Sequence, residues 1–298
     1  MQRLFIVYNP RSTRAELIRK EVILPAKELK GFLVGKFEVE QISVVKNAGR
    51  LAKLLDDGDI VMTAGGDGTT EVGVNAIMEC GKDVRLMVLP YGNFNDVARM
   101  FGMMEFKNIF DTKVVEAYPL ECLVNGKHFQ YAFGYFTVGM MADAARMLNR
   151  GKKRAHLRKN KNNTMFALTS AVKWYLKNRK RKFLLAVKYN GKEMGDMTEY
   201  FAVNSGTVAR IMKLSPSFMK KKEFKSGIFD LKNFWKMTWF GMRSVLCGLK
   251  LSESVGDKLE FAEPVKVVVQ SEGECVEIAE VETLEFKKCG RPIKVFKI

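Results

Sequence analysis

A glycine-rich turn between an apolar run and a helical pattern constrains the fold of this chain more than any other segment. The run Ile60–Met62 is followed by Gly65-Gly66-Asp67-Gly68-Thr69, after which a helical pattern begins. A strand, turn and helix in this order expose backbone N–H groups at a helix N-terminus, where the helix dipole favours phosphate. The glycines permit close approach to the backbone because they have no Cβ. A surface turn is the alternative, but the order of residues favours a phosphate site.

Two other apolar runs end in similar turns. Leu4–Val7 leads into Asn9-Pro10-Arg11-Ser12-Thr13, and Val84–Leu89 leads into Pro90-Tyr91-Gly92-Asn93-Phe94-Asn95-Asp96. In a parallel sheet, the turns at the carboxyl ends of the strands share one edge, where ligands bind. The sequence therefore predicts an α/β domain with a parallel sheet and three ligand-binding loops. The helices expected to cover this sheet are Arg14–Leu29, Ala48–Asp57, Thr70–Glu79 and Asn95–Phe101.

These segments resemble the diacylglycerol kinase-like lipid kinases, which include the sphingosine kinases and bacterial relatives. The resemblance rests on Asn9-Pro10-x-Ser12, Gly65-Gly66-Asp67-Gly68-Thr69 and Gly92-x-x-Asn95-Asp96-x-Ala98-Arg99. It holds over the first hundred residues and is weaker towards the C-terminus. NAD kinases and phosphofructokinases share the Gly-Gly-Asp-Gly-Thr motif, whereas the Asn-Asp-x-Ala-Arg stretch favours the lipid kinases. The resemblance implies an ATP- and Mg²⁺-dependent kinase that phosphorylates a lipid hydroxyl, with diacylglycerol as the expected acceptor and phosphatidic acid as the product.

The resemblance also implies which residues form the site. Asp67 is expected to position the Mg²⁺ of Mg–ATP, directly or through water. In the family the base is the Asp of an Asp-Gly-Glu motif, and this chain has Glu272-Gly273-Glu274 there, so Glu272 is the expected base with Glu274 beside it. A polar turn between two surface strands is the alternative for this segment. The expected nucleotide-binding residues are Asn9, Pro10, Arg11, Ser12, Thr13, Gly65, Gly66, Asp67, Gly68, Thr69, Asn93, Asn95 and Asp96.

Several positions depart from the family pattern. Thr13 replaces a glycine, Asn93 replaces a threonine, and the acid after the glycine motif is shifted by one position, to Glu71, and so to another face of the helix. Ser226 replaces an Asp that contributes to a structural Mg²⁺ site in bacterial members, so that metal is expected to be absent. These changes concern activity and not fold. Two alternatives therefore stay open: a soluble small-molecule kinase of the NAD kinase type, and a catalytically silent nucleotide- or membrane-binding relative.

The pattern changes near Ala117-Tyr118-Pro119, which divides the chain into predicted domains 1–117 and 118–298. Strand-like segments and hairpin turns such as Asn125-Gly126 predict an antiparallel β-sandwich in the second domain. Helical spacing of Met165, Leu168, Val172 and Leu176 predicts one helix within it, and the last strand, Pro292–Ile298, is expected to return to the first domain. The predicted strands are Leu120–Val124, His128–Gly134, Phe183–Tyr189, Met197–Val203, Val265–Val269, Cys275–Ile278 and Thr283–Phe286.

The charge of the chain is distributed unevenly. Its net charge is +17, yet residues 1–118 carry 16 basic and 16 acidic side chains, and residues 146–250 alone carry a net +21. Anionic lipid attracts such a domain. Nucleic acid is not expected, since no zinc finger, RNP-like motif or helix-turn-helix accompanies the charge. No apolar run approaches the roughly 20 residues that span a bilayer. The expected location is cytoplasmic, at the inner face of the membrane, and the family's tendency to dimerise makes a homodimer an expected state.

One aromatic segment has two interpretations. Phe234–Arg243 contains two Trp, two Phe and two Met with basic residues between them. This composition suits a segment that lies in a membrane interface. Because aromatic clusters are more often part of a core, packing against the sandwich is the prediction, and exposure of Trp235 or Trp239 would reverse it.

Histidine and cysteine chemistry is not expected. The chain has only His128 and His156, and its cysteines lack metal-ligand spacing, so reduced thiols are predicted. The cysteines are Cys80, Cys122, Cys247, Cys275 and Cys289.

Overall fold

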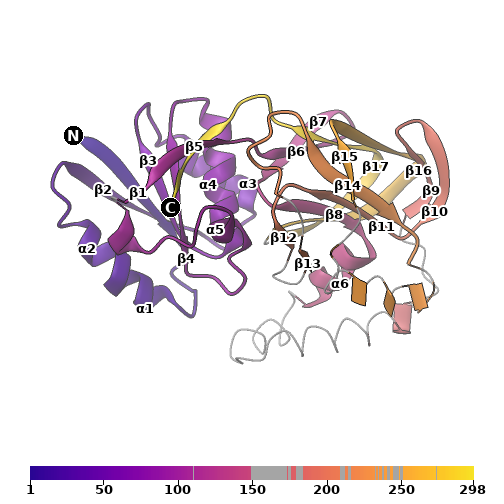
Figure 1. Ribbon diagram of the computed structural model, residues 1–298, viewed down its shortest axis with the longest axis horizontal. Helices are drawn as coiled ribbons and strands as arrows, with labels where there is room; N and C mark the ends of the chain where they lie inside the picture. Colours follow the sequence, from indigo (N-terminus) through magenta and orange to yellow (C-terminus); the bar gives the residue numbers. More distant parts are fainter. Residues whose placement is uncertain are drawn as a thin grey trace.

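The computed structural model of the 298-residue chain contains two sheets that lie next to each other, each with its own core (Figure 1). It describes residues 1–109, 111–148, 184–208, 212–213, 216–231, 251–272 and 274–298, and also 173, 176–178, 233, 235–236, 238–239, 242–243 and 248. The predicted fold class, a parallel α/β domain followed by an antiparallel domain, is confirmed. The predicted boundary at 117–118 falls between Lys113–Ala117, a strand of the first sheet, and Leu120–Val124, a strand of the second.

Six strands of the described chain form the first sheet, in the order β2-β1-β3-β4-β18-β5. The first four are mutually parallel, and β18 is parallel to β4 but antiparallel to β5. The end of the chain therefore crosses back into the first domain, as the yellow strand in Figure 1 shows. The strands are β1 Gln2–Tyr8, β2 Phe32–Glu38, β3 Ile60–Gly65, β4 Arg85–Pro90, β5 Lys113–Ala117 and β18 Ile293–Lys297.

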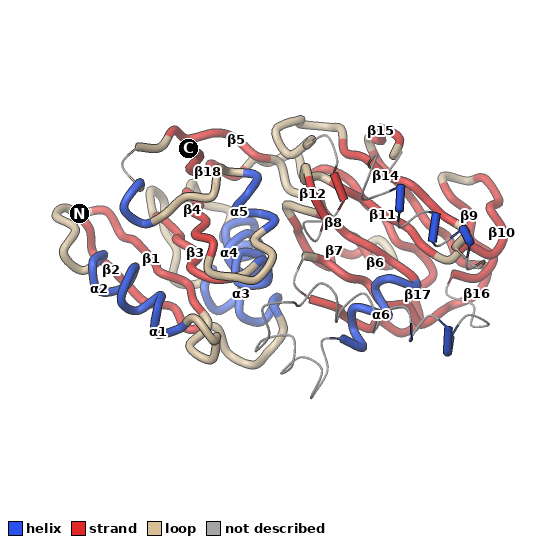
Figure 2. Tube along the Cα trace, turned by 60° about the horizontal axis from the view of Figure 1, so that its bottom comes forward, coloured by secondary structure: helices blue, strands red, loops and turns tan. Residues whose placement is uncertain are grey.

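Helices cover both faces of this sheet, which is why its central strand β3 is buried at every position. In β3, Val61 belongs to the core under α3 and α4, whereas Met62 belongs to the core under α1 and α2. The helices α3 and α4 lie between the sheet and the second domain, and α1 and α2 lie on the outer side (Figure 2). The helical elements of this domain are α1 Ala15–Ile18, η1 Arg19–Ile23, α2 Leu24–Ala26, α3 Val44–Ala52, α4 Asp67–Cys80, α5 Asp96–Met100 and η2 Phe106–Asn108.

Two of these helices differ from the prediction in physically understandable ways. The first is continuous over α1, η1 and α2, but its middle turn is π-helical. Pro25 lacks the N–H that an α-helix would donate to Glu21, so a wider turn ahead of it costs little. Helix α3 begins at Val44 and not at Ala48, because the Ser43 hydroxyl caps it by accepting a hydrogen bond of 3.3 Å from the Lys46 N–H.

The second domain is built on one antiparallel sheet of ten described strands, in the order β15-β14-β11-β8-β16-β17-β6-β7, with β9 joining β16 to β10. A short ladder of β12 Thr207–Val208 and β13 Met212–Lys213 and a helix, α6 Met140–Leu148, accompany it. The strands are β6 Leu120–Val124, β7 Lys127–Ala132, β8 Tyr135–Gly139, β9 Leu184–Tyr189, β10 Lys192–Met197, β11 Glu199–Val203, β14 Phe224–Phe229, β15 Ser252–Ser254, β16 Gly256–Ser271 and β17 Glu274–Lys288.

This sheet folds over on itself, so the two layers of the predicted sandwich are parts of one hydrogen-bonded sheet. The long strand β16 pairs with β9 at one end and with β8 at the other, and its register shifts between Glu260 and Val267. Rings from separate strands meet inside: Phe286 of β17 lies 4.8 Å from Tyr200 of β11 and 5.7 Å from Phe136 of β8. The short segments predicted at 265–269 and 275–286 thus belong to two long strands.

One set of hydrogen bonds joins the two points where the chain passes between the domains, and another joins the domains themselves. The buried ammonium of Lys288 donates to the carbonyls of Tyr118 and Ser217, each at 3.0 Å, and to Asn204. Farther away, the Asn75 amide of α4 donates to the Tyr131 carbonyl of β7 and accepts from its N–H, both at 2.8 Å. The domains therefore meet with defined geometry at the edge where the loops lie.

Part of the predicted helix in the second domain lies outside the described residues. Met165, Leu168 and Val172 are among these, while Leu176 has helical backbone and is exposed. Within the described part of the chain, no helix is both long and apolar enough to cross a membrane.

Candidate functional site

Three loops of the first domain meet at one edge of the parallel sheet. Tyr8, Ala64 and Leu89 lie level in neighbouring strands, so β1, β3 and β4 end together. The loop after β1 holds itself in shape: the Asn9 side chain accepts from the Arg11 N–H at 2.9 Å, and the Ser12 hydroxyl accepts from the Arg14 N–H at 3.2 Å. The structure thus brings together the three segments that the sequence predicted to form the nucleotide site.

The glycines of the other two loops are required by their close contact. A Cβ on Gly92 would lie 2.2 Å from the Cα of Gly66, so the loops after β3 and β4 touch through their backbones. A Cβ on Gly65 would lie 2.5 Å from the Thr69 hydroxyl. A larger residue at position 92 would therefore push the two loops apart, whereas one at position 65 would displace the Thr69 side chain within its own loop.

Asn95 shapes the loop after β4 and has little capacity left for a ligand. Its φ is +55°, in the left-handed region that asparagine tolerates better than most residues. Its carbonyl oxygen accepts from the Gly92 N–H at 2.7 Å, and its amide donates to the carbonyls of Pro90 and Gly92 at 3.1 and 3.0 Å. Asn93 is exposed at the loop surface. The predicted ligand contacts of these two residues stay predictions.

Asp67 is the first residue of α4 and links the two glycine loops. Its carboxylate accepts a hydrogen bond of 3.1 Å from the Val97 N–H at the start of α5. Burial raises the pKa of Asp67 to about 6, and the nearby charge of Asp96 adds to this effect. A buried carboxylate at the joint of two phosphate-type loops is placed to bind a hard cation.

Glu272 reaches this edge from the second domain. It follows β16, is buried, and accepts a hydrogen bond from the Gly134 N–H in the turn between β7 and β8. Its pKa is raised well above the usual range for a carboxyl, first by burial and then by the charge of Glu71, with smaller effects from Asp67 and Asp96. Among the described residues, its second oxygen has no hydrogen-bond partner.

Glu71 and Gly134 were not identified as parts of this site by the sequence. Glu71 is fully buried on α4, one turn before Asn75, whose amide binds the strand that leads to Gly134. The shift of this acid along the helix therefore places it beside Glu272 and does not remove it from the cleft. The shifted position of this acid relative to the family motif was visible in the sequence. Its place in the site follows only from the packing of α4 against β7.

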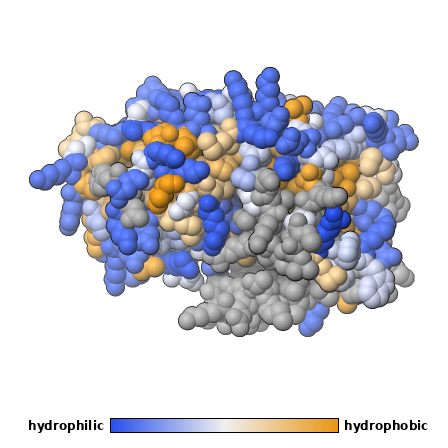
Figure 3. Space-filling view, viewed as in Figure 1, coloured by the Kyte–Doolittle hydropathy of each residue, from blue (hydrophilic) through white to orange (hydrophobic). Residues whose placement is uncertain are grey.

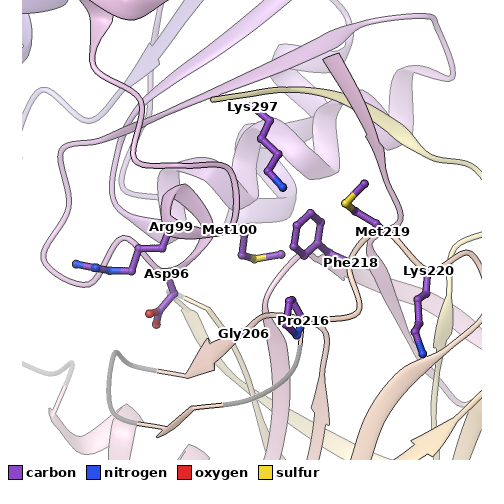
Figure 4. Close-up of a pocket in the computed structure, with 9 residues that line it drawn as sticks. All are labelled: Asp96, Arg99, Met100, Gly206, Pro216, Phe218, Met219, Lys220 and Lys297. Carbon is purple, nitrogen blue, oxygen red and sulfur yellow. The ribbon is translucent and has the colours of Figure 1, made fainter. Parts of the chain in front are cut away.

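A pocket of about 330 Å³ lies between the two domains, and Asp96 is the acid among its lining residues (Figure 4). Met100 of α5 and Phe218 and Met219 of the second domain form its apolar part. Lys297 of β18 points towards Phe218, with its ammonium 5.7 Å from the ring centre, and Asp96 borders the pocket on the side of the glycine loops. No local sequence pattern predicts this pocket, because its walls come from three distant parts of the chain.

Comparisons with known proteins agree with the geometry of these loops. The family description "Diacylglycerol kinase catalytic domain" matches residues 3–118. The chain is 25% identical over 243 residues to the diacylglycerol kinase of Bacillus subtilis strain 168, which covers 78% of this chain and 73% of that protein.

Its fold is similar to the crystal structure of a diacylglycerol kinase from Bacillus anthracis, with a TM-score of 0.68, 14% identity and coverage of 100% and 97% of the two chains. A second structure from that bacterium gives a TM-score of 0.67 with 16% identity at the same coverage. Residues 3–118 therefore match the catalytic domain of diacylglycerol kinases, and the comparisons support a kinase of this type.

Glu274 and Ser226 stand where diacylglycerol kinase-like proteins have acids of their motifs. In this structure, both residues make contacts that support the fold. The Glu274 carboxylate accepts a hydrogen bond of 3.1 Å from the Val44 N–H, the first of helix α3, so it joins the second domain to the first. Ser226, where the family has an Asp, is buried in β14 with its hydroxyl 3.3 Å from that of Tyr189. The catalytic role of Glu274 and the absence of a metal at Ser226 stay predictions.

Proposed function

We propose that this kinase transfers the γ-phosphoryl group of ATP to the hydroxyl of a lipid, with diacylglycerol as the acceptor and phosphatidic acid as the product. The observation that carries the proposal is the position of Glu272, which comes from the second domain and is near enough to Asp67 of the glycine loops for the charge of Asp67 to raise its pKa. Phosphoryl transfer requires phosphate-binding loops and a residue that orients or deprotonates the acceptor hydroxyl. The two domains supply one of these each.

Glu272 serves as the base in this proposal. The acceptor oxygen bonds to the γ-phosphorus while its proton passes to the Glu272 carboxylate. The bond between the γ-phosphorus and the bridging oxygen breaks, and ADP leaves with that oxygen. The raised pKa of Glu272 suits a general base, because a more basic carboxylate takes up the proton more readily.

Asp67 fits a Mg²⁺ site, since its carboxylate is a buried oxygen donor. The negative charge of Asp96 is nearby and repels that of Asp67, and a cation would relieve this repulsion. Mg²⁺ held by this carboxylate, directly or through water, would neutralise charge on the phosphates. The backbone N–H groups at the start of α4 bind phosphate oxygens, and Asn9 and Ser12 line the nucleotide side of the cleft.

The acceptor lies on the other side of Asp67 from the β1 loop. The pocket formed by Met100, Phe218 and Met219 receives the apolar part of the acceptor beside its hydroxyl. The basic second domain rests on an anionic membrane surface, which supplies the lipid. The protein accordingly works in the cytoplasm, peripherally bound to the inner face of the membrane.

Transfer of label from γ-labelled ATP to diacylglycerol in phosphatidylglycerol vesicles with Mg²⁺ tests this function. The variants are Asp67→Ala and Glu272→Gln, and Glu263→Gln is the control because Glu263 is an exposed acid on the same strand as the residues leading to Glu272. The proposal is supported if the parent protein and the control form labelled lipid and both site variants do not. Unchanged turnover in Glu272→Gln would remove Glu272 as the base.

The altered motif positions favour a test of a second candidate, a catalytically silent relative. Glu71 and Glu272 both depart from the family pattern and lie together in the cleft. ATP binding without transfer to any member of a panel of lipid alcohols supports the silent protein. Turnover of a soluble acceptor without vesicles supports a kinase of the NAD kinase type.

A further inference from the structure

Two tryptophans just after β14 are exposed, contrary to the predicted core packing. The exposed fraction is 76% for Trp235 and 62% for Trp239, and Met242 is 50% exposed. Trp235 is the most exposed aromatic residue of the described chain. Hydrophilic side chains cover most of the described surface visible in Figure 3, so a pair of open indoles is unusual for this protein.

These apolar side chains have the spacing of one helix face. The described residues at 235–236, 238–239 and 242–243 have helical backbone. Trp235, Trp239 and Met242 follow one another at intervals of four and three residues, which is the spacing of neighbours on one side of a helix. A large apolar face exposed to water marks an interaction site.

The start of this segment is fixed to the sheet. Leu231 is buried, and its N–H donates to the Thr198 hydroxyl at 2.5 Å. The Asn233 side chain accepts from the Trp235 N–H at 2.9 Å, and the Lys236 ammonium donates to the Asp230 carboxylate at 3.1 Å. Hydrogen bonds therefore hold the chain that leads into Trp235 against the sheet.

We infer that Trp235, Trp239 and Met242 form an anchor that inserts into the interface of an anionic membrane. Indole rings prefer the boundary between water and lipid, because each combines a large apolar surface with one N–H donor. Lys236 and Arg243 lie beside them, and residues 146–250 carry a net +21. Anionic headgroups attract this charge, whereas a second copy of the chain would bring the same positive charge to the patch.

The anchor is distant from the proposed chemistry. It follows Phe229, which pairs with Glu199 of β11, and Glu199 pairs with Gly139 at the end of β8. Glu272 lies near the other end of β8, where Phe136 pairs with Ser271. Phe136 and Gly139 are three residues apart, roughly 10 Å along the strand, and Trp235 follows Phe229 by six more residues. We therefore expect the anchor to affect attachment and not phosphoryl transfer. The inference extends the proposed function, but vesicle binding can be measured without nucleotide or acceptor.

Binding to phosphatidylglycerol vesicles in the absence of ATP tests the anchor. The chain has three tryptophans, so in a Trp174→Phe protein the tryptophan fluorescence comes from Trp235 and Trp239 alone. Vesicles should shift their emission to the blue, and brominated lipid should quench it. Trp235→Ala/Trp239→Ala should weaken vesicle binding by at least tenfold.

Val255→Ala is the matched control, because Val255 is 68% exposed in the same domain but follows β15, which pairs with the opposite end of β14. Its vesicle affinity should equal that of the parent. Thermal unfolding checks that each variant is folded. Emission that does not change while the protein is bound would overturn the anchor. A double alanine variant that binds vesicles normally but loses a dimer in sedimentation would assign the patch to a second copy instead.

Discussion

Gly134→Ala tests whether the position of the Glu272 carboxylate controls the rate. A Cβ at residue 134 would lie 2.9 Å from Oε1 of Glu272, 3.2 Å from its Cγ and 3.3 Å from its Cδ. The first distance is about 0.5 Å below the shortest ordinary contact of 3.4 Å. The fold can yield cheaply here, because the group that must move is the end of one side chain.

The expected cost falls on catalysis. A misplacement of about 1 Å can lower a rate by about 100-fold, so a shift of about 0.5 Å should lower kcat roughly tenfold, or about 1.4 kcal/mol in the barrier. Steady-state kinetics with vesicle-bound diacylglycerol measures kcat, while KM for ATP should change little. Gly256→Ala is the control, since the nearest atom to a Cβ there is 3.9 Å away.

Replacing Glu272 by Asp in the Gly134→Ala protein provides a second check. The shorter side chain removes one methylene from the crowded space, so the double variant should lose less activity than the two single losses combined. A folded Gly134→Ala protein with unchanged kcat would refute the reasoning, because the carboxylate would then tolerate displacement.

Three other outcomes are expected. Asp67 with a pKa of about 6 should bind Mg–ATP progressively less well as the pH falls below 6, as calorimetric titration would detect. Asn75→Ala loses two hydrogen bonds to the Tyr131 backbone and should lower the free energy of unfolding by about 2 kcal/mol in urea. Burial lowers the pKa of Lys288 to about 7 from 10.5, so the unfolded chain binds this proton more tightly between these values. Stability should therefore rise with pH there by up to about 1.4 kcal/mol per unit, and Lys288→Met should remove the rise.

The loops that carry the site were predictable because local chemistry determines them. Gly65 and Gly66 stand where the backbone must turn without side chains, and the apolar runs before them need two covered faces. Parallel pairing then brings the three loops to one edge without further information. The contact between Gly66 and Gly92 was not predictable, since it depends on how closely β3 and β4 bring the loops together.

Contacts between side chains that are distant in the sequence could not be predicted from it. Glu71 and Glu272 meet only because α4 packs against β7, and no local pattern encodes that contact. The prediction of core packing for the tryptophans was wrong for a related reason: an aromatic cluster in the sequence has the same composition whether its side chains are covered or exposed. Trp235 has the spacing of a core residue and the exposure of a surface residue.

The turn between β16 and β17 explains how two domains can share one site. Glu272 at its start accepts the Gly134 N–H within its own domain, and Glu274 at its end accepts the first N–H of α3 in the other domain. A carboxylate at a helix N-terminus also interacts favourably with the helix dipole. The position of Glu272 relative to Asp67 is therefore held from both sides, by Gly134 within its own domain and by the Glu274 contact across the cleft. Any motion that separates the domains must break that contact and withdraw Glu272, so the two domains have to be together for the proposed base to face the nucleotide loops.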